Sequence, residues 1–417
     1  MDNITHSLVG LAVGEAAYEI RRYNEKPDNR IFRRYLLIAS IIANNFPDVD
    51  VFYSGLLGRL GNLLHHRGHT HTILMALPEA LLLFFGLRYF ARFRKHSFEK
   101  MDWRAVGALC FLGPLIHLWL DGLNSYGVHP FWPFSNRWFY GDTLFIVEPW
   151  LWVTLTLSLI RCFSTRYSRI ALATLAIIGV LLTWGTGMVP YELSVSLTVW
   201  AILFYFAMRY ISPRWRMATG LFAVCLLVLG FNRTSSYIKK DFAQYYLSKY
   251  EETSLKDTIL SPFPANPFCW TILTVELHED KTHYFMRRGV MAPFPKLMGL
   301  SRCEKTNFTD VGNFQADPKL EHVHWLTQVR VDLKWLKYFQ DHSCLAKEFL
   351  QFSRAPFLMK EDKQVKLVDL RFVRKSSSSF SEVVLVDDPK CLKIPVPWIA
   401  PRQDVLNEYS LSLIEEK

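Results

Sequence analysis

Six apolar stretches are long enough to cross a membrane as helices, and they constrain the fold more than any other feature. They cover about residues 72–91, 105–122, 144–161, 170–187, 192–210 and 217–232. A helix needs roughly 20 mainly apolar residues to span a bilayer. Two weaker stretches, 4–20 and 35–46, either cross as a pair or form a half-inserted hairpin. The sequence therefore predicts a polytopic transmembrane helical bundle with about six to eight spans.

The composition changes near residue 232, where the last apolar stretch ends. Beyond it the chain is more polar and contains runs such as CWTILTVEL and HVHWLTQVRVDL. Alternating apolar residues with many β-branched side chains favour antiparallel strands. We therefore expect a mainly α protein with two domains, a membrane-embedded helical domain (1–232) and a soluble α+β domain that is mainly antiparallel β (233–417).

The distribution of Lys and Arg predicts which side of the membrane each loop faces. Loops at 21–34, 92–104, 161–169 and 209–216 carry 17 of these residues, whereas the alternate loops at 47–71, 122–143 and 188–193 carry three. Basic loops remain on the cytoplasmic side. The sequence therefore predicts a multi-pass protein of the inner (plasma) membrane, with residues 47–71 and the soluble domain on the extracytoplasmic, periplasmic side.

The net charge of +10 would also fit a protein that binds nucleic acid. Most of the positive excess, however, lies in the short cytoplasmic loops of the membrane half and forms no continuous patch. We therefore expect membrane lipids as partners and no nucleic acid.

Four cysteines of the soluble half, Cys269, Cys303, Cys344 and Cys391, have two possible states. Outside the cytosol they either form two disulfides, by one of three connectivities, or remain thiols.

Histidines and carboxylates gather at the predicted outer ends of the membrane segments. Ionisable residues in such positions are energetically unfavourable and by default mark a functional site. His117 and Asp121 stand four residues apart and share one face of a helix. The other members of the group are His6, Asp48, Asp50, the loop HHRGHTH at 65–71, Asp142 and Glu148.

This set of side chains favours a metal centre. It combines imidazole with carboxylate and contains no thiolate, and catalytic zinc sites have such ligands. It also offers more ligands than one tetrahedral ion needs, so we expect two ions, most plausibly zinc, with manganese and iron as alternatives. Arg67 within the histidine loop matches a phosphate or carboxylate group, or else it is a structural partner of Asp48 or Asp50.

Several motifs together resemble a known family. MDxxTH at 1–6, PDxD at 47–50, HRGxTH at 66–71, HxxxD at 117–121 and the segment around Asp142 are similar to the YdjM-like inner-membrane metal-dependent hydrolases. The motif order is also similar, more loosely, to the zinc-dependent phospholipase C fold. The resemblance covers about the first 150 residues. It implies as metal ligands His6, Asp48, Asp50, His66, His71, His117 and Asp121.

These observations predict a membrane-bound metal-dependent hydrolase that acts on a phosphoester of a lipid or lipid-linked molecule at the extracytoplasmic face. Arg67 would hold the anionic group, and Asp142 or Glu148 would serve as general base. The soluble domain would cap the site, select the substrate or bind a protein partner. The alternative is a non-enzymatic membrane protein with a structural metal site and a partner-binding outer domain.

Overall fold

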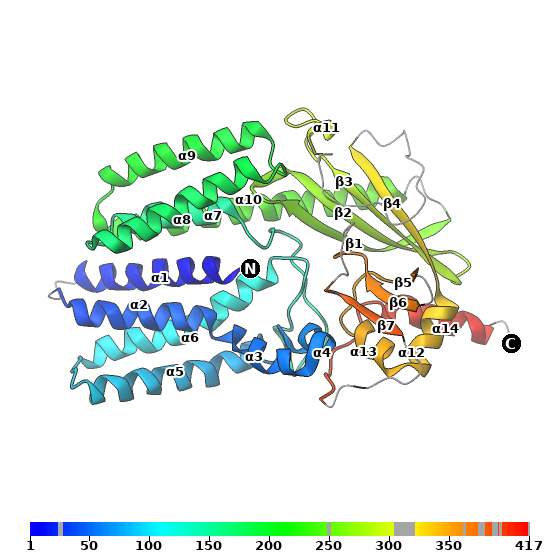
Figure 1. The fold of residues 1–417 in the computed structure, drawn as a ribbon, viewed down its shortest axis with the longest axis horizontal. Helices are drawn as coiled ribbons and strands as arrows, with labels where there is room; N and C mark the ends of the chain where they lie inside the picture. The colour runs from blue at the N-terminus through cyan, green and yellow to red at the C-terminus, as the bar shows by residue number, and fades with distance from the viewer. Residues whose placement is uncertain are drawn as a thin grey trace.

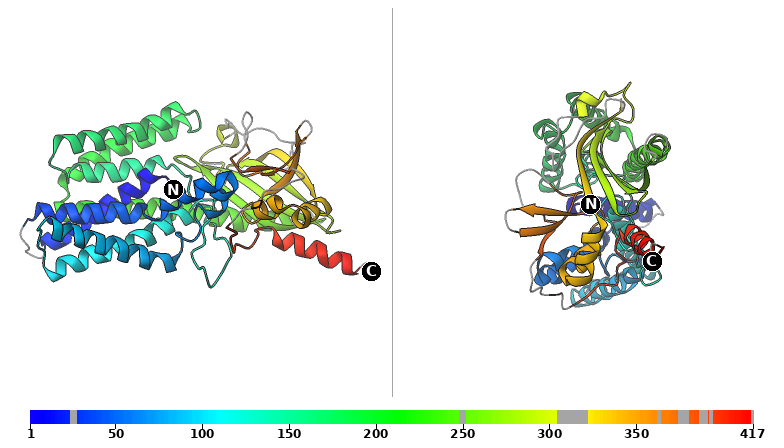
Figure 2. Two further views of the ribbon diagram at one scale, coloured as in Figure 1. Left: turned by 60° about the horizontal axis from the view of Figure 1, so that its bottom comes forward. Right: turned by 90° about the vertical axis from the view of Figure 1, so that its right-hand side faces the viewer.

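The computed structural model describes residues 1–23, 28–247, 252–303, 322–361, 364–373, 380–385, 391 and 394–415. A bundle of long helices forms one end of the molecule, and two antiparallel sheets lie beyond the other end of the bundle (Figure 1). Figure 2 shows the same arrangement from two further sides. The predicted fold class, a mainly helical membrane protein with a C-terminal domain of antiparallel sheets, is confirmed.

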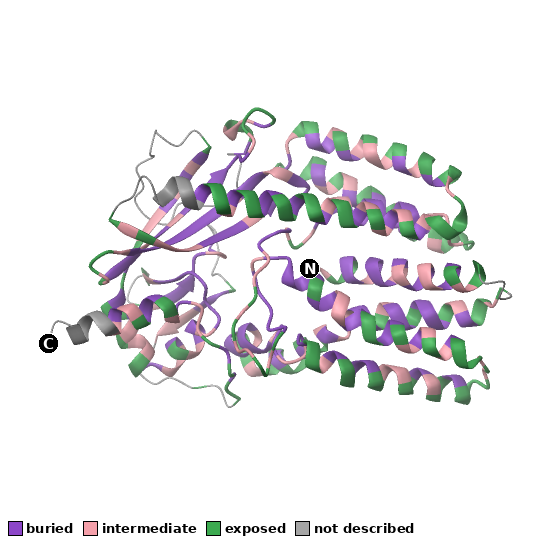
Figure 3. Ribbon diagram, turned by 180° about the vertical axis from the view of Figure 1, so that it is seen from behind, coloured by how far each residue is buried: buried purple, intermediate pink, exposed green. Residues whose placement is uncertain are grey.

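The bundle consists of eight described helices. They are α1 (Asn3–Tyr23), α2 (Arg30–Asn45), α5 (Ile73–Phe93), α6 (Lys100–Gly122), α7 (Pro149–Ile160), α8 (Arg166–Gly185), α9 (Tyr191–Tyr210) and α10 (Pro213–Leu247). Exposed residues follow the outer faces of these helices, while buried residues face inward (Figure 3). Many of the exposed residues are large and apolar, such as Leu82 and Phe85 on α5. This pattern is expected of helices whose outer faces contact lipid.

Among the described helices, α5, α6, α8, α9 and α10 are long and apolar enough to cross a membrane. The stretch predicted at 144–161 instead gives α7, a helix of 12 residues. Pro149 occupies the first turn of α7, and the Glu148 side chain accepts a hydrogen bond from the Trp150 N–H. Proline and a capping carboxylate both mark a helix start, so the apolar residues before Glu148 lie outside the helix.

The weaker N-terminal stretches form the antiparallel pair α1 and α2. Glu15, buried on α1, receives two hydrogen bonds of 2.8 Å from Arg33 on α2. Because a buried charge needs a partner, this ion pair allows an acidic residue to lie inside the bundle.

Short helices connect α2 to α5 at the end of the bundle nearest the sheets. They are the 3-10 turn η1 (Pro47–Val49), α3 (Asp50–Ser54), the 3-10 turn η2 (Gly55–Leu57) and α4 (Gly58–His65). The histidine loop follows α4, and Thr72 ends it by capping α5, where its hydroxyl accepts from the Met75 N–H.

The outer domain contains two described sheets. The first has the order β1 (Thr253–Phe263), β2 (Asn266–His278), β3 (His283–Met291), β4 (Val323–Asp332), and the second has the order β5 (Pro356–Glu361), β6 (Gln364–Asp369), β7 (Glu382–Leu385). All neighbouring strands are antiparallel. Around the sheets lie α11 (Leu300–Cys303), α12 (Leu333–His342), α13 (Cys344–Leu350) and α14 (Gln403–Glu415). Disulfides join Cys269 to Cys303 and Cys344 to Cys391.

The outer domain packs directly on the bundle. Helix α10 continues without a break across residue 232, where we expected the domain boundary. Leu63 and Leu64 of α4 belong to the same apolar core as Phe349 and Trp398 of the outer domain. The histidine loop therefore lies between the bundle and the outer domain.

Candidate metal centre

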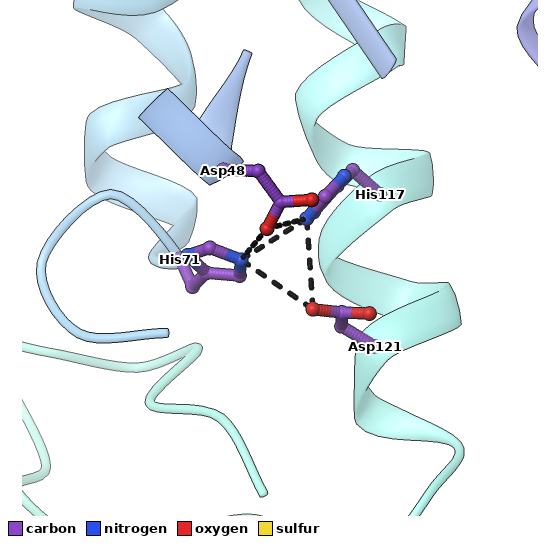
Figure 4. Close-up of side chains that lie close together, drawn as sticks. All are labelled: Asp48, His71, His117 and Asp121. Atoms are coloured by element: carbon purple, nitrogen blue, oxygen red, sulfur yellow. Dashed lines mark hydrogen bonds and ion pairs between the residues drawn. The ribbon is translucent and has the colours of Figure 1, made fainter. Parts of the chain in front are cut away.

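Four of the predicted ligands meet at the mouth of the bundle, namely Asp48 on η1, His71 in the histidine loop, and His117 and Asp121 on α6 (Figure 4). His117 Nε2 and His71 Nε2 are 3.0 Å apart. Asp48 Oδ1 lies 3.4 Å from His71 Nε2 and 3.5 Å from His117 Nε2. Asp121 Oδ2 lies 3.4 Å and 3.6 Å from the same two nitrogens.

These separations fit one metal ion. Zinc bound by nitrogen and oxygen at about 2.0–2.1 Å in a tetrahedron would keep its ligand atoms roughly 3.3–3.4 Å apart. The five measured separations run from 3.0 to 3.6 Å.

The protonation of both imidazoles also fits a metal. His117 Nδ1 lies 2.7 Å from the backbone oxygen of Asn44, which can only accept, so this nitrogen carries the proton. Thr70 donates its hydroxyl proton to Asp50, so its oxygen accepts from His71 Nδ1 at 3.0 Å. In the neutral rings, each Nε2 then presents a lone pair to the centre. A second partner that fixes the imidazole in this way is usual for metal-binding histidines.

The charges around His71 favour a cation. Burial acts to lower the pKa of His71, but the carboxylates of Asp121, Asp48 and Asp50 outweigh it and raise the pKa well above its ordinary value. The same negative potential that favours a proton on the ring favours a metal ion at the centre.

Asp50 and His66 lie beside this cluster and form a second possible group with Asp48. Asp50 is fully buried and accepts from the Arg67 N–H at 2.9 Å and the Thr70 hydroxyl at 2.8 Å. His66 Nδ1 lies 2.9 Å from Asp50 Oδ1. Asp50 thus fixes the histidine loop, and Asp48 is the residue common to both groups.

His6, the seventh predicted ligand, stacks on His117 with ring centroids 3.8 Å apart. Its Nε2 contacts Asp121 Oδ1 at 3.2 Å, and the Met1 amino group also contacts this oxygen. His6 therefore lies next to the four-residue cluster and outside it.

The Arg67 side chain pairs with Asp121, whereas the structural role considered for Arg67 was with Asp48 or Asp50; Arg67 contacts Asp50 through its backbone N–H. Its Nε lies 2.8 Å from Asp121 Oδ2, Nη1 donates to Asn124 at 3.1 Å, and the guanidinium lies over the Tyr126 ring. Arg67 adopts a φ of +63°, a left-handed conformation that is uncommon outside glycine. Non-glycine residues in this region cluster at functional sites.

The structure brings neither predicted general base into the cluster. Asp142 is buried between two cations, Arg354 at 2.8 Å and Lys239 at 2.7 Å. Glu148 caps α7 and accepts from the Ala265 N–H of the outer domain at 3.3 Å. Both residues tie the bundle to other elements.

Glu79 on α5 was missed by the sequence reasoning. It is buried, and neither carboxylate oxygen has a hydrogen-bond partner among the described residues. An acidic residue within the apolar stretch 72–91 is the feature that would have identified it. Glu79 lies on the helix that directly follows the histidine loop.

Residues of the outer domain cover the histidine loop. The Trp398 indole donates to the Leu64 backbone oxygen at 2.8 Å and stacks on His129 at 3.7 Å. His65 Nε2 lies 2.9 Å from the Ile394 backbone oxygen. A Cβ at Gly68 would approach the His65 oxygen to 2.8 Å and Trp398 to 3.3 Å. Only glycine fits this turn without displacing a neighbour.

Fold and site together define a multi-pass membrane protein with a buried group of histidines and aspartates that could hold a metal ion at the mouth of its helices. Residues 1–193 match the model of a family described as YdjM inner membrane protein. The predicted resemblance is thereby confirmed for this region, which contains all seven ligands predicted from the sequence. The chain is thus an inner-membrane multi-pass protein, while the looser similarity to the phospholipase C fold stays a prediction.

Two curated proteins are similar to part of the chain. Inner membrane protein YbcI of Escherichia coli (strain K12) is 27% identical over 173 residues, which are 40% of this chain and 83% of YbcI. Uncharacterized protein YfhP of Bacillus subtilis (strain 168) is 24% identical over 160 residues, which are 37% of this chain and 44% of YfhP. The chain therefore spans less than half the length of YfhP. No solved structure matches the chain.

Proposed function

We propose that this protein is a membrane-bound metal-dependent hydrolase that cleaves a phosphoester of a lipid or lipid-linked molecule at the extracytoplasmic face. The observation that carries the proposal is the convergence of His71 Nε2, His117 Nε2 and two carboxylate oxygens at separations of 3.0–3.6 Å.

Asp48, His71, His117 and Asp121 would hold the first ion, and Asp48, Asp50 and His66 a second one, with Asp48 bridging. Zinc suits these ligands best, and manganese or iron are the alternatives. When bound, such ions supply Lewis-acid stabilisation of developing negative charge and lower the pKa of water at the site.

Arg67 would contribute a fixed positive charge. Its guanidinium lies against Asp121 and Asn124, so its position is set before any substrate arrives. A group that is already oriented stabilises negative charge without reorganisation during the reaction. In this proposal, Arg67 orients the anionic group of the substrate, and Asp142 and Glu148 are structural.

An apolar cavity supports a lipid substrate. It has a volume of about 470 Å³ and lies beside the end of α6, where Gly122 and Leu123 directly follow Asp121. Leu118, Trp119 and Phe131 are among its lining residues. A cavity with this lining accommodates an acyl or prenyl chain, whose attached phosphate would then lie near the end of α6.

Two observations support the proposal that the site faces the extracytoplasmic side of the membrane. Lys and Arg are concentrated in the loops at the opposite end of the bundle, as the positive-inside rule requires of the cytoplasmic side. The outer domain contains two disulfides, whereas Cys110, Cys162 and Cys225 of the bundle are free. Disulfides persist in oxidising compartments such as the periplasm.

One observation favours a structural metal site. Four protein ligands fill a tetrahedral ion, and structural zinc sites are closed in this way, whereas catalytic sites keep one position for water. A second ion bridged by Asp48, or a fifth ligand on the first ion, would provide the open position.

The test combines metal content with hydrolysis. We would purify the full chain in detergent, measure bound metal by elemental analysis, and assay cleavage of a chromogenic phosphodiester and of phospholipid vesicles. The variant is His117→Ala with Asp48→Asn, and the matched control is His69→Gln, in the same loop but packed on Trp132 and Trp398.

At the bundle centre we expect about two zinc equivalents, together with phosphoester cleavage, in the wild type and the control. The folded variant should lose these two equivalents and the cleavage. One equivalent without cleavage, whose loss unfolds the protein, would establish the structural role. No bound metal in a chelator-free preparation would overturn the proposal.

A further inference from the structure

The sequence HEDKTH at 278–283 forms the turn between β2 and β3 of the outer domain. His278 ends β2 directly after Leu277, and His283 begins β3 directly before Tyr284, the residue that pairs with Leu277. The two imidazole rings therefore lie opposite each other across the hairpin, stacked with centroids 4.4 Å apart. The Nδ1 atoms of both rings lie near the Asp280 carboxylate in the turn.

Asp280 completes a compact group of three ligand atoms. Its Oδ1 lies 3.0 Å from His278 Nδ1 and 3.5 Å from His283 Nδ1. Ligand atoms of a tetrahedral zinc ion with bonds of about 2.0–2.1 Å lie roughly 3.3–3.4 Å apart. Both separations are thus close to the spacing that an ion would impose.

We propose that His278, Asp280 and His283 form a second, separate metal site that binds a first-row divalent ion such as Zn²⁺ through two imidazoles and one carboxylate. Two nitrogens and one oxygen without thiolate suit zinc, copper or nickel better than magnesium or calcium. Three protein ligands leave one position of a tetrahedral ion for water or for a group from a partner molecule.

The exposure of the three side chains fits a site that ions can enter. His283 is buried, with a side chain 6% exposed, whereas the side chains of His278 and Asp280 are 26% and 45% exposed. One ligand is thus fixed by packing, and the other two face solvent.

The turn is already in place without an ion. The Thr282 N–H donates to Asp280 Oδ1 at 2.8 Å, and the Asp280 N–H donates to His278 Nδ1 at 3.3 Å. His278 Nδ1 therefore carries a lone pair, as a metal ligand must, and this lone pair would turn from the Asp280 N–H to the ion. The Thr282 hydroxyl lies 2.9 Å from His283 Nδ1. This hydrogen bond would have to break before the nitrogen could bind an ion.

Nearby charges do not oppose binding strongly. Arg330 on β4 lies 3.2 Å from Asp332, the residue paired with His283 across the strands, so its charge is compensated. Lys281 lies within the turn, and its long, flexible side chain can keep its charge in solvent.

This site is independent of the centre in the bundle. Strand β2 begins at Asn266, next to Ala265, whose N–H contacts Glu148 beside α7. Thirteen residues of extended strand at about 3.3 Å each place His278 roughly 40 Å further along. No ligand is shared, so either proposal can fail while the other holds.

The experiment uses the full-length protein in detergent, stripped with chelator and titrated with Zn²⁺ in equilibrium dialysis. The variant is His278→Gln with His283→Gln. The matched control is His342→Gln, an exposed histidine of α12 whose ring stacks on Tyr338 and whose Nδ1 lies 2.8 Å from the Tyr338 backbone oxygen. All three proteins are also made with His117→Ala and Asp48→Asn, so that the bundle centre no longer contributes to the count.

In that background we expect one Zn²⁺ equivalent for the unmodified hairpin and the control, and none for the hairpin variant. Cu²⁺ should give an electron paramagnetic resonance spectrum with coupling to two imidazole nitrogens, and the variant should lose this coupling. His278 is partly exposed, and glutamine is a polar replacement for the buried His283, so the hairpin variant should remain folded, which circular dichroism checks. Equal Zn²⁺ equivalents, or affinities within twofold of each other, would overturn the proposal.

Discussion

Arg354 of the outer domain holds Asp142 of the α6–α7 loop through two parallel contacts, Nη1 to Oδ1 at 2.8 Å and Nη2 to Oδ2 at 3.0 Å. The Nε of the same guanidinium donates to Asp257 on β1 at 2.8 Å. One buried cation thus compensates two carboxylates, one from the membrane half and one from the outer domain.

Replacing Arg354 by Met should destabilise the protein by about 3 kcal/mol, the lower end of the range for breaking a buried ion pair. Both carboxylates lose their shared cation, but Asp142 keeps Lys239 and Asp257 keeps Arg402. The measurement is the thermal unfolding midpoint in detergent. Arg330→Met is the control, since Arg330 and Asp332 form an exposed pair, which contributes about 0–1 kcal/mol. Equal decreases of the unfolding midpoint in the two variants would show that the buried ion pair stabilises the protein no more than the exposed one.

Asp50→Asn should weaken binding of the first Zn²⁺ ion, the one assigned to Asp48, His71, His117 and Asp121, by about 10–100-fold without abolishing it. The reason is that Asp50 orients His71 and the loop, and loss of such an orienting partner has effects of this size. Asp48→Asn should remove binding altogether. Competition with a fluorescent chelator measures both affinities, and identical losses would mean that Asp50 is itself a ligand of the same ion.

Gly68→Ala should destabilise the protein by about 1–3 kcal/mol, the usual range for overpacking. The added Cβ would lie 2.8 Å from the His65 backbone oxygen, which cannot move without shifting α4. Gly55→Ala provides the comparison, because a Cβ at Gly55 meets nothing within 4 Å. The measurement is the thermal unfolding midpoint of both variants. An unchanged midpoint for Gly68→Ala would show that the loop rearranges to accept the added methyl group.

His129 should make stability depend on pH. Burial lowers the pKa of His129 to about 3, whereas an unfolded histidine has a pKa of about 6.5. Between these values the unfolded state binds the additional proton, so stability falls as the pH drops below about 6.5, by about 2 kcal/mol at pH 5.

His129→Asn should therefore lose less stability between pH 7.5 and pH 5 than the wild type, as measured by the unfolding midpoint at each pH. His342→Asn, on the exposed surface of α12, should keep the wild-type difference. If His129→Asn keeps the full difference too, acid sensitivity arises elsewhere.

The sequence was most informative for features that depend on one segment alone, such as a membrane helix or two side chains on the same helix face. The apolar stretches gave α5, α6, α8, α9 and α10, because length and hydrophobicity alone decide whether a helix can span. The spacing of His117 and Asp121 placed both on one face of α6. Asp48 and His71 joined them as the motif order indicated.

Roles that depend on distant partners could not be predicted. From the sequence, Asp142 was a candidate general base. Its ion pair with Arg354, 212 residues later in the chain, is visible only in the tertiary structure. Glu15 and Arg33 behave similarly, since an acidic residue weakens the prediction of α1 as a membrane helix when its partner is unknown. The pairing of the four outer cysteines likewise required the tertiary structure.

The contact between Trp398 and the Leu64 backbone oxygen joins residues 334 positions apart. At a synthesis rate of about 5–20 residues per second, Trp398 emerges roughly 20–70 s after Leu64. During that interval the histidine loop stands at the membrane surface without its indole cover. Final packing of the histidine loop therefore waits until the segment that contains Trp398 has been synthesised and has docked on α4.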